Sequence, residues 1–304
     1  MMRWFITCLC LALAPTLYAQ ITVTNVSVAD AFVRSLDPTH NYGGAGALSV
    51  SGSIATNVLG QQEGLLDSFM RFDMSGAVSN FNTSFGVGRW VTVGATLVLF
   101  EQGQPNNTIF NRGVGPFEVR WIADNSWIEG TGNPNNPTTD GIVWNDEPSA
   151  LNSNLDESLG TFVNGGTDGV VNATLEIPSG FASQLSTNGL VSFYMTATTN
   201  SAVGFTFHSH NFVTPAEWPY LQITAAPIPQ ITSIGIIGGI VRISFTTGSN
   251  LSYIAQYNNS MAAGGWNTLT NVIGNGDTMT IADSNVTTVR QRFYRVGLIV
   301  GPQN

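Results

Sequence analysis

The 304-residue chain contains 10 arginines, no lysine and 19 acidic residues, which gives a formal net charge of −9. Nucleic-acid binding needs a basic surface that displaces counterions, so this composition excludes nucleic acid as a partner. The same deficit of basic residues disfavours binding to an anionic membrane surface. Charged residues make up only 10% of the chain, and Asn, Thr, Ser and Gly fill most polar positions, a composition that we expect of an extracellular β protein.

The first 19 residues are predicted to be a signal peptide. Residues 1–3 provide a positively charged start, residues 4–14 an apolar run, and residues 17–19 a cleavage site with small residues. The apolar run is shorter than the ~20 residues that cross a bilayer. Cleavage before Gln20 would produce a secreted or cell-surface protein, with no membrane span after the signal is removed.

Both cysteines, Cys8 and Cys10, lie inside this predicted signal peptide. The mature chain would therefore have no disulfide, no thiolate nucleophile and no cysteine-ligated zinc. Such a secreted protein must be stabilised by the size of its core, which about 285 residues can provide.

Residues 20–225 are predicted to form a jelly-roll β-sandwich. Short segments with a two-residue alternation of apolar and polar positions recur about every ten residues, separated by Gly, Pro and Asn. Residues 177–185 could form one or two helical turns, and no other helical periodicity persists. The strand segments are 26–35, 47–54, 67–74, 93–101, 116–123, 189–197, 204–210 and 219–225.

A long loop comes after the predicted strand at residues 116–123. Residues 127–148 are rich in Gly, Asn, Pro and Thr, which favour consecutive turns, and the loop is bracketed by Trp127 and Trp144. We expect both tryptophans to be buried and to fix the ends of the loop to the sandwich. Residues 132–141 would remain free to contact a ligand or a neighbouring protein.

Residues 226–230 contain Pro227 and Pro229 and are predicted to be a stiff linker. Residues 231–304 contain six further strand-like segments, which predict a smaller β-sandwich of the fibronectin type III or immunoglobulin kind. This second domain would act as a spacer or a docking module.

Several motifs resemble one known family when they are taken in order. They are ADAFVRS (29–35), HNYGGAGALSVSG (40–52), SFMRFDMSG (68–76), VGATLVLFEQG (93–103), WIEGTG (127–132), IVWNDEP (142–148), FTFHSHN (205–211) and EWPYLQIT (217–224). Residues 29–225 thereby resemble the DNRLRE domain, grouped as carbohydrate-binding module family 96, of secreted bacterial and archaeal proteins. The resemblance implies a jelly roll that binds polysaccharide, alginate for some members. The C-terminal segments are more loosely similar to the fibronectin-like tails of secreted bacterial proteins.

The chain departs from this family where a basic and an acidic residue usually follow a serine. Here the sequence is Ser209-His210-Asn211. Because basic residues, lysine included, serve the recognition of uronates, the departure argues against an alginate-type ligand.

Strand alternation groups the predicted ligand-binding residues. Arg34, Arg71, His208 and His210 each lie opposite an apolar side of their own strand, so they could line one solvent-facing sheet. Planar guanidinium and ring side chains on such a face suit sugar binding, and Tyr42 offers a further aromatic platform. The alternative is that these residues are scattered over the surface, even on opposite sheets.

Two metal sites are conceivable, one from strand alternation and one from aspartates at strand ends. His208 and His210 project the same way from a strand, and a third ligand for a transition metal could come from His40, Glu217 or Asp37. A structural calcium ion could instead bind at Asp30 or Asp73, near strand ends, although turn capping by these aspartates is the simpler explanation. No other cofactor is expected.

No catalytic signature is present in the sequence, so we predict that the protein is not an enzyme. Paired carboxylates for glycoside hydrolysis exist only by count (Glu118, Asp124, Glu129, Asp146 and Glu147), and there is no G-x-S-x-G elbow. The predicted function is binding of an extracellular polysaccharide. The alternative is a structural subunit of a matrix, surface layer or filament that assembles with copies of itself or with other surface proteins; a polysaccharide lyase or hydrolase is a third alternative.

Overall fold

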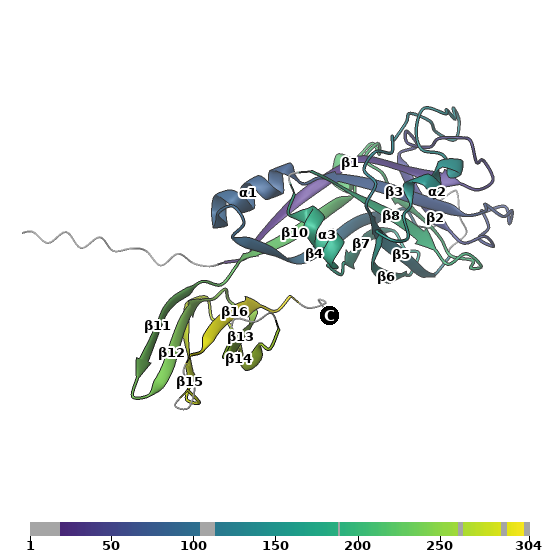
Figure 1. Cartoon of the computed structure of the whole chain (residues 1–304). Coiled ribbons are helices and arrows are strands. Elements are labelled where there is room, and N and C mark those ends of the chain that lie inside the picture. The colour runs from purple at the N-terminus through teal and green to yellow at the C-terminus, as the bar shows by residue number, and fades with distance from the viewer. Residues whose placement is uncertain (1–18, 104–112, 188, 261–263, 287–290, 301–304) are drawn as a thin grey trace, which may run out of the picture. The chain divides into compact units, whose positions relative to one another are not determined.

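Antiparallel strands dominate the computed structural model, which describes residues 19–103, 113–187, 189–260, 264–286 and 291–300 (Figure 1). Strands make up 49% of the structure and helices 11%, which confirms the predicted all-β class of β-sandwich type. The chain divides into two units, residues 20–226 and 227–299. Apart from Ala19, the predicted signal peptide lies outside the described residues. Within the described ranges, no helix has the length and apolarity needed to cross a membrane.

The first unit contains ten hydrogen-bonded strands in its described part. Their order is β1-β10-β4-β9-β2-β3-β8-β5-β6, with β7 beside β4 and a further pairing of β1 with β3. Their bounds are β1 (Ile21–Arg34), β2 (Ala47–Ser51), β3 (Leu66–Asp73), β4 (Trp90–Glu101), β5 (Gly115–Ile122), β6 (Glu157–Asn164), β7 (Gly169–Thr174), β8 (Leu190–Ala197), β9 (Gly204–His208) and β10 (Tyr220–Pro227).

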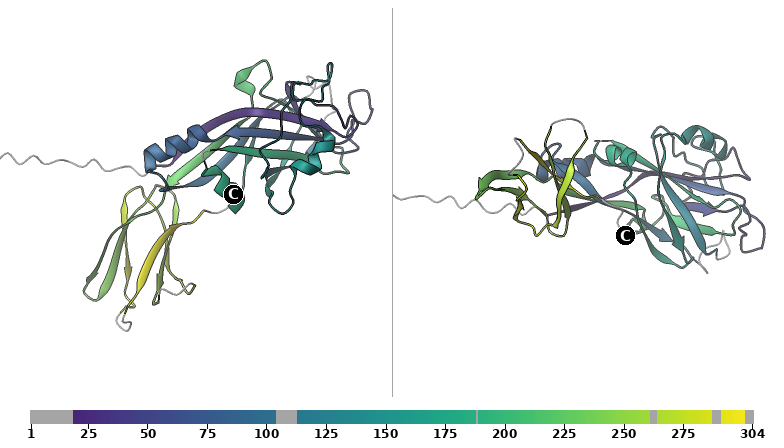
Figure 2. Two further views of the ribbon diagram at one scale, coloured as in Figure 1. Left: turned by 45° about the horizontal axis from the view of Figure 1, so that its top comes forward. Right: turned by 60° about the horizontal axis from the view of Figure 1, so that its bottom comes forward.

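Strand β1, the long purple strand in Figure 2, takes part in two ladders. Residues 21–26 pair with β10, whereas residues 29–34 pair with β3, and the register shifts between Ser27 and Ala29. A bulge of this kind bends a strand, and here it lies where β1 passes from one partner to the other. The main core contains the inward side chains of β2–β5 and β7–β10, with Met70, Phe117, Phe193 and Phe207 among its buried members.

The outer face of β1, β3 and β8 is also buried. Ala31, Phe69 and Tyr194 lie on this face, and they pack against residues of the long loop between β5 and β6. The loop side of this second cluster is provided by Trp127, Ile142 and Ala150. The sheet therefore has a core on both faces at this position, which two-residue alternation alone does not reveal.

Helix α3 (Ser179–Leu185) lies inside the segment predicted to be helical, whereas α1 (Ser75–Phe85) was not predicted. Ala77, Val78 and Phe81 are the buried residues of α1. This apolar stripe spans little more than one turn among Ser, Asn and Thr, which are weak helix formers, so the sequence pattern missed it. The remaining short helices are η1 (Trp144–Asp146), α2 (Glu147–Ala150) and η2 (Pro215–Glu217).

The second unit consists of two three-stranded antiparallel sheets in its described part, ordered β11-β12-β15 and β14-β13-β16. Phe245 and Tyr253 are the largest side chains of its core. Strand β10 extends to Pro227, so it overlaps the segment 226–230 predicted as a linker. The strands are β11 (Ile231–Ile237), β12 (Ile240–Thr246), β13 (Ser252–Asn258), β14 (Asn267–Ile273), β15 (Thr278–Asp283) and β16 (Phe293–Leu298).

Candidate functional site

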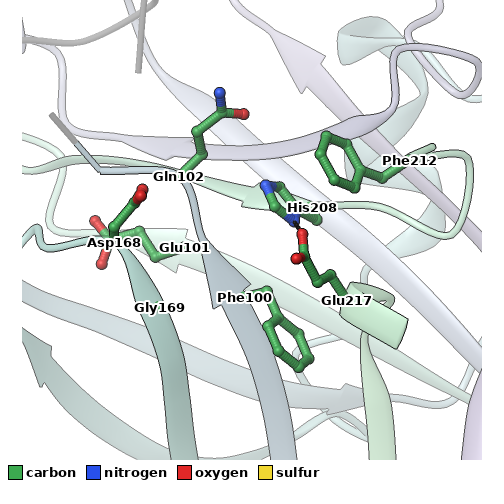
Figure 3. Close-up of a pocket in the computed structure, with 8 residues that line it drawn as sticks. All are labelled: Phe100, Glu101, Gln102, Asp168, Gly169, His208, Phe212 and Glu217. Carbon is green, nitrogen blue, oxygen red and sulfur yellow. Dashed lines mark ion pairs between the residues drawn. The ribbon is translucent and has the colours of Figure 1, made fainter. Parts of the chain in front are cut away.

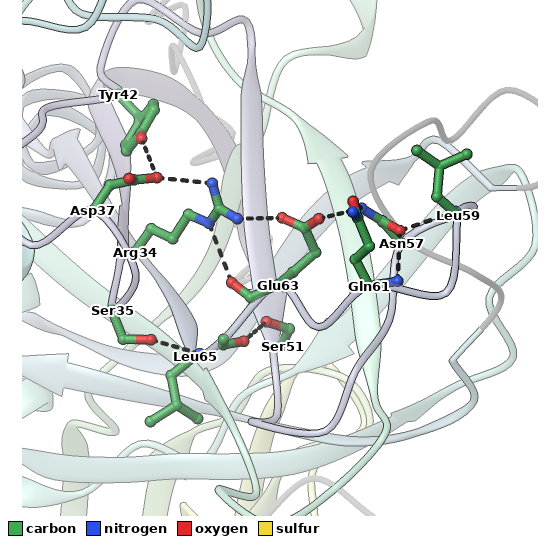
Figure 4. A network of polar contacts seen from close by, with 11 residues as sticks. Arg34, Ser35, Asp37, Tyr42, Ser51, Asn57, Leu59, Gln61, Glu63 and Leu65 are labelled. Atoms are coloured by element: carbon green, nitrogen blue, oxygen red, sulfur yellow. Dashed lines mark hydrogen bonds and ion pairs between the residues drawn. The ribbon is translucent and has the colours of Figure 1, made fainter.

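Arg34 ends β1 in a network of internal polar contacts (Figure 4). Its guanidinium lies 2.8 Å from Oδ2 of Asp37 and 2.7 Å from Oε2 of Glu63, and its Nε donates to the Glu63 carbonyl oxygen at 3.1 Å. Three of its N–H donors are thus used to tie the end of β1 to the turn that follows it and to the loop that precedes β3. All three guanidinium nitrogens are therefore engaged in internal contacts.

Tyr42 joins the same network and is buried. Its ring stacks on Phe32 with a centroid distance of 4.6 Å, and its hydroxyl donates to Oδ2 of Asp37 at 3.0 Å. Burial, together with the nearby Asp37 carboxylate, raises the pKa of the Tyr42 hydroxyl to about 12. Since the ring is only 5% exposed, Tyr42 offers no platform for a sugar, contrary to the sequence-based prediction.

Arg71 secures the long loop. Its guanidinium lies 4.4 Å from the ring centre of Trp127, and Nη1 donates to the carbonyl oxygens of Asn125 at 2.6 Å and Trp127 at 3.0 Å. Burial lowers the pKa of Arg71, with the nearby Glu129 and Asp124 carboxylates opposing this effect. This arginine is therefore a structural contact of the loop.

The expectation that Arg34 and Arg71 line one solvent-facing sheet face is wrong. Ala29 pairs with Arg71 and Leu66 pairs with Arg34 in the β1–β3 ladder, and directly paired residues point to the same face. Positions 29 and 34 of β1 point to opposite faces, so the two arginines do as well. Each arginine does lie opposite an apolar side of its own strand. The apolar side of β1 (Ala31, Val33) and that of β3 (Met70, Phe72) belong to two different hydrophobic clusters, however.

His208 and His210 contact different groups. Nδ1 of His208 lies 2.9 Å from Oε2 of Glu217, whereas Nδ1 of His210 lies 3.3 Å from Oδ1 of Asp30 and 3.2 Å from Oε1 of Glu129. The predicted transition-metal site that joins both histidines is therefore not formed. Glu217, one of its predicted third ligands, is the partner of His208 alone.

The two aspartates considered for calcium also lie in different environments. Asp30 is completely buried, whereas Asp73 is exposed at the end of β3. Oδ1 of Asp73 accepts a hydrogen bond from the backbone N–H of Ser75 at 2.8 Å, which is the turn-capping role considered from the sequence.

A pocket of about 280 Å³ opens beside His208 (Figure 3). It is built from the end of β4, the start of β7, the end of β9 and the segment that leads into η2. The labelled residues together span more than 100 positions of the sequence, from Phe100 to Glu217. The lining residues are Phe100, Glu101, Gln102, Asp168, Gly169, His208, Phe212 and Glu217.

The ring of Phe212 fixes the imidazole of His208. The two rings stack with a centroid distance of 3.6 Å and an interplanar angle of 14°. Burial lowers the pKa of His208, although Glu217 and, more weakly, Asp168 raise it in part. Near neutral pH the imidazole is therefore uncharged, with a ring nitrogen available for hydrogen bonding.

Two further carboxylates hold the opposite wall of the pocket. Oε2 of Glu101 accepts a hydrogen bond from Nδ2 of Asn164 at 2.6 Å, and Oδ1 of Asp168 accepts one from the backbone N–H of Gly103 at 2.7 Å. These contacts orient the carboxylates at the ends of β4 and β7. The pocket thus combines aromatic rings with acidic hydrogen-bond acceptors, and none of the described residues that line it is an arginine.

Of the five predicted ligand-binding residues, only His208 lines this pocket. Phe100, Glu101, Asp168 and Phe212 were not predicted. Phe100 lies on the side of β4 opposite Leu99, so alternation marks it as an outward aromatic, but nothing in the sequence places it beside residue 168 or 212.

An aromatic and acidic pocket on an antiparallel β-sandwich is the type of site that binds a polar, ring-shaped ligand such as a sugar. The sequence profile of carbohydrate-binding module family 96 matches residues 21–225, about two thirds of the chain. The chain belongs to this family of carbohydrate-binding modules. A search of curated protein sequences gave no match.

Proposed function

We propose that this protein is a secreted, non-catalytic protein that binds an extracellular polysaccharide through the pocket lined by His208, Phe212 and Glu217. The observation that carries this proposal is the combination of two phenylalanine rings with three carboxylates around one pocket of about 280 Å³. Small-molecule sites have volumes of roughly 300–1,000 Å³, so this pocket is suited to one sugar unit of a longer chain.

The chemistry of the pocket favours a neutral sugar. Aromatic rings offer apolar planes to the C–H faces of a pyranose, and carboxylates are strong acceptors for its hydroxyl groups. A uronate carboxylate would instead face Glu101, Asp168 and Glu217, with no arginine among the lining residues that the structure describes to compensate it. We infer a neutral polysaccharide, in agreement with the absence of lysine from the chain.

Secretion is supported by the composition of residues 1–19. The non-catalytic role is supported by membership of a family of binding modules. It predicts that a polysaccharide that binds the protein releases no new reducing ends after long incubation, and measurable release would favour the lyase or hydrolase alternative.

Affinity electrophoresis of the purified protein tests this proposal. Gels that contain neutral polymers (xylan, mannan, β-glucan) are compared with gels that contain alginate or polygalacturonate. We expect at least one neutral polymer to retard the protein and the uronate polymers to have no effect. Retardation by uronates alone would contradict the proposed ligand class.

Phe212→Ala is the variant that tests the pocket, and Val213→Ala is its matched control. Val213 is the next residue, is 87% exposed and lies outside the lining of the pocket. Loss of one aromatic–sugar contact should weaken binding by about fivefold, taking the ~1 kcal/mol typical of an aromatic contact. Equal retardation of the two variants would place the binding surface elsewhere.

A structural subunit remains the second candidate because of strand β11. It is an edge strand of its sheet and is exposed along all seven residues, with Ile234 57%, Ile236 73% and Ile237 65% exposed. An exposed apolar edge is a template for pairing with another chain. Concentration-dependent polymers in size-exclusion chromatography, combined with no retardation on any polysaccharide gel, would favour assembly over carbohydrate binding.

A further inference from the structure

Three side chains from distant segments meet beside the end of β9. Asp30 lies in β1, Glu129 lies in the long loop after β5, and His210 follows β9. One oxygen of each carboxylate and Nδ1 of the imidazole all lie within 4.8 Å of one another. Among the described residues, these three side chains form a group of His and acidic residues close enough to bind one cation together.

The two distances from the imidazole nitrogen to the carboxylates match those within a coordination shell. Nδ1 of His210 is 3.3 Å from Oδ1 of Asp30 and 3.2 Å from Oε1 of Glu129. Ligand atoms that surround a metal tetrahedrally at about 2.0–2.1 Å are separated by about 3.3–3.4 Å. Both distances to the imidazole nitrogen are therefore close to the edges of such a tetrahedron.

Two of the three donor atoms, Oδ1 of Asp30 and Nδ1 of His210, lack a hydrogen-bond partner. Asp30 is 0% exposed, and neither its Oδ1 nor Nδ1 of His210 makes a hydrogen bond of acceptable geometry, even though the two atoms are close. A buried carboxylate oxygen without a hydrogen bond is costly, and a cation between the donor atoms would remove this cost.

Surrounding groups hold the donor atoms in place. The other oxygen of Asp30, Oδ2, accepts hydrogen bonds from the backbone N–H of His210 at 2.9 Å and from Oγ of Ser27 at 3.2 Å. Nδ2 of Asn211 donates to Oε1 of Glu129 at 2.7 Å and to the Gly43 carbonyl oxygen at 3.0 Å. Such outer contacts orient ligands in metal sites.

From this geometry we propose that Asp30, Glu129 and His210 bind one divalent transition-metal ion of the zinc class. One nitrogen and two carboxylate donors suit Zn²⁺, whereas Ca²⁺ takes six to eight oxygen ligands. The His210 and Glu129 side chains are 19% and 21% exposed, which leaves a path for the ion and for a water molecule as fourth ligand. The bound ion would tie β1 and the segment after β9 to the long loop.

Isothermal titration calorimetry of the full-length protein, without a histidine tag and after treatment with EDTA, tests the site. We expect one equivalent of Zn²⁺ to bind and to raise the melting temperature, Co²⁺ to give the intense visible absorption of a tetrahedral site, and Ca²⁺ not to compete. Absence of zinc binding, or equal affinity for calcium, overturns the proposal.

His210→Ala should weaken zinc binding more than about 100-fold, whereas Asn211→Ala should weaken it by about tenfold, the effect typical of an outer contact. His208→Ala and His40→Ala are the matched controls and should bind zinc as the unmodified protein does. Zinc binding that survives in His210→Ala but is lost in His208→Ala would overturn the assignment.

A second variant separates a metal site from a simple ion pair and does not depend on the alanine variant folding. His210→Lys retains a positive charge beside Asp30 and Glu129 but provides no imidazole donor. We expect this variant to fold, with a melting temperature that zinc does not change. Zinc binding by His210→Lys with unchanged affinity would show that the cluster is not the metal site.

Discussion

Nδ1 of His208 lies 2.9 Å from Oε2 of Glu217, and the two residues come from β9 and from the short helix η2 that precedes β10. This contact at the edge of the imidazole holds the segment 209–217 against the sheet, and Phe212 stacks on the face of the same ring. The same segment places His210 beside Asp30. One turn after β9 thus supplies residues both to the proposed sugar pocket and to the proposed metal site.

Glu217→Ala should impair polysaccharide binding with little effect on stability. The Glu217 side chain is 39% exposed, and the contact of such an exposed carboxylate with the uncharged His208 imidazole contributes no more than the roughly 0–1 kcal/mol of a surface ion pair. Its loss removes one acceptor from the pocket and the partner of His208. Affinity electrophoresis and thermal melting measure the two effects, with the exposed Glu176→Ala as control; a large drop in melting temperature would show that Glu217 is mainly structural.

Arg71→Ala should destabilise the first unit. The change removes two hydrogen bonds to loop carbonyl oxygens and the contact with the Trp127 ring. We expect a loss of about 2–3 kcal/mol in the free energy of unfolding. Urea unfolding measures it. Arg120→Ala, whose ion pair with Glu118 spans 3.7 Å at the surface, should cost less than about 1 kcal/mol. Equal effects would contradict the role of Arg71.

Asn41→Ala should release the middle of the long loop. Asn41 is completely buried; Nδ2 donates to the carbonyl oxygens of Glu129 and Ile142, and Oδ1 accepts from the backbone N–H groups of Gly43 and Gly132. Its loss leaves several buried backbone groups unpaired, at a cost of about 3 kcal/mol. Limited proteolysis should then cleave within residues 129–142.

The matched control is Asn135→Ala, at the exposed tip of the same loop. The backbone N–H of Asn135 donates to Oδ1 of Asn133, whereas its exposed side chain ties no described part of the loop to the sheet. This variant should resist proteolysis as the unmodified protein does. Cleavage of both variants at the same rate would mean that Asn41 does not organise the loop.

Stability should fall as the pH rises from about 4 to 7, because of two buried carboxyl groups. Burial raises the pKa of Asp67 to about 6, and burial together with the nearby Asp67 raises that of Glu147 to about 7. The Tyr194 hydroxyl donates to Oε1 of Glu147 at 3.1 Å. The folded state therefore keeps protons that the unfolded chain releases, so their stabilising effect is complete below pH ~4 and lost above pH ~7.

Asp67→Asn tests this pH dependence. It should reduce the slope of unfolding free energy against pH and stabilise the protein at pH 8, by up to about 3 kcal/mol for a pKa raised from 3.8 to about 6. Asp73→Asn, at the exposed end of the same strand, should leave the slope unchanged. Urea unfolding between pH 4.5 and 8 measures the slope, and identical slopes in all three proteins would contradict this assignment.

Asp283→Asn should destabilise the second unit. Oδ2 of Asp283 lies 2.6 Å from Nη1 of Arg292 and accepts a hydrogen bond from the Tyr294 hydroxyl at 2.9 Å, and the two charged side chains are 1% and 8% exposed. Removing one charge of such a buried pair costs about 3 kcal/mol. Calorimetry should show a lower melting transition, while Asp277→Asn, in an exposed turn, should not change it.

Sequence alternation predicted most strands of the first unit, because apolar residues at every second position mark the side facing a core. It also predicted the burial of Trp127, which is 6% exposed and donates its Nε1–H to Oγ of Ser192 at 3.0 Å. Trp144 is half-buried against the same cluster. A large aromatic beside a turn-rich segment has few alternatives to packing on the sheet, so a local signal was enough.

The choice between the two faces of a sheet could not be made from local signals. Arg34 and Arg71 each lie opposite apolar neighbours, yet the bulge at Ser27 and the loop over β1, β3 and β8 decide which face is covered. Phe212 and Asp168 likewise meet only because β4 lies between β7 and β9 in the pairing order.

The sequence by itself determined the all-β class and the likeness to a carbohydrate-binding family, since both depend on periodicity and on short motifs along the chain. Only the tertiary structure decided which side chains form the pocket and the Asp30–Glu129–His210 cluster, because those contacts depend on strand pairing between segments far apart in the chain.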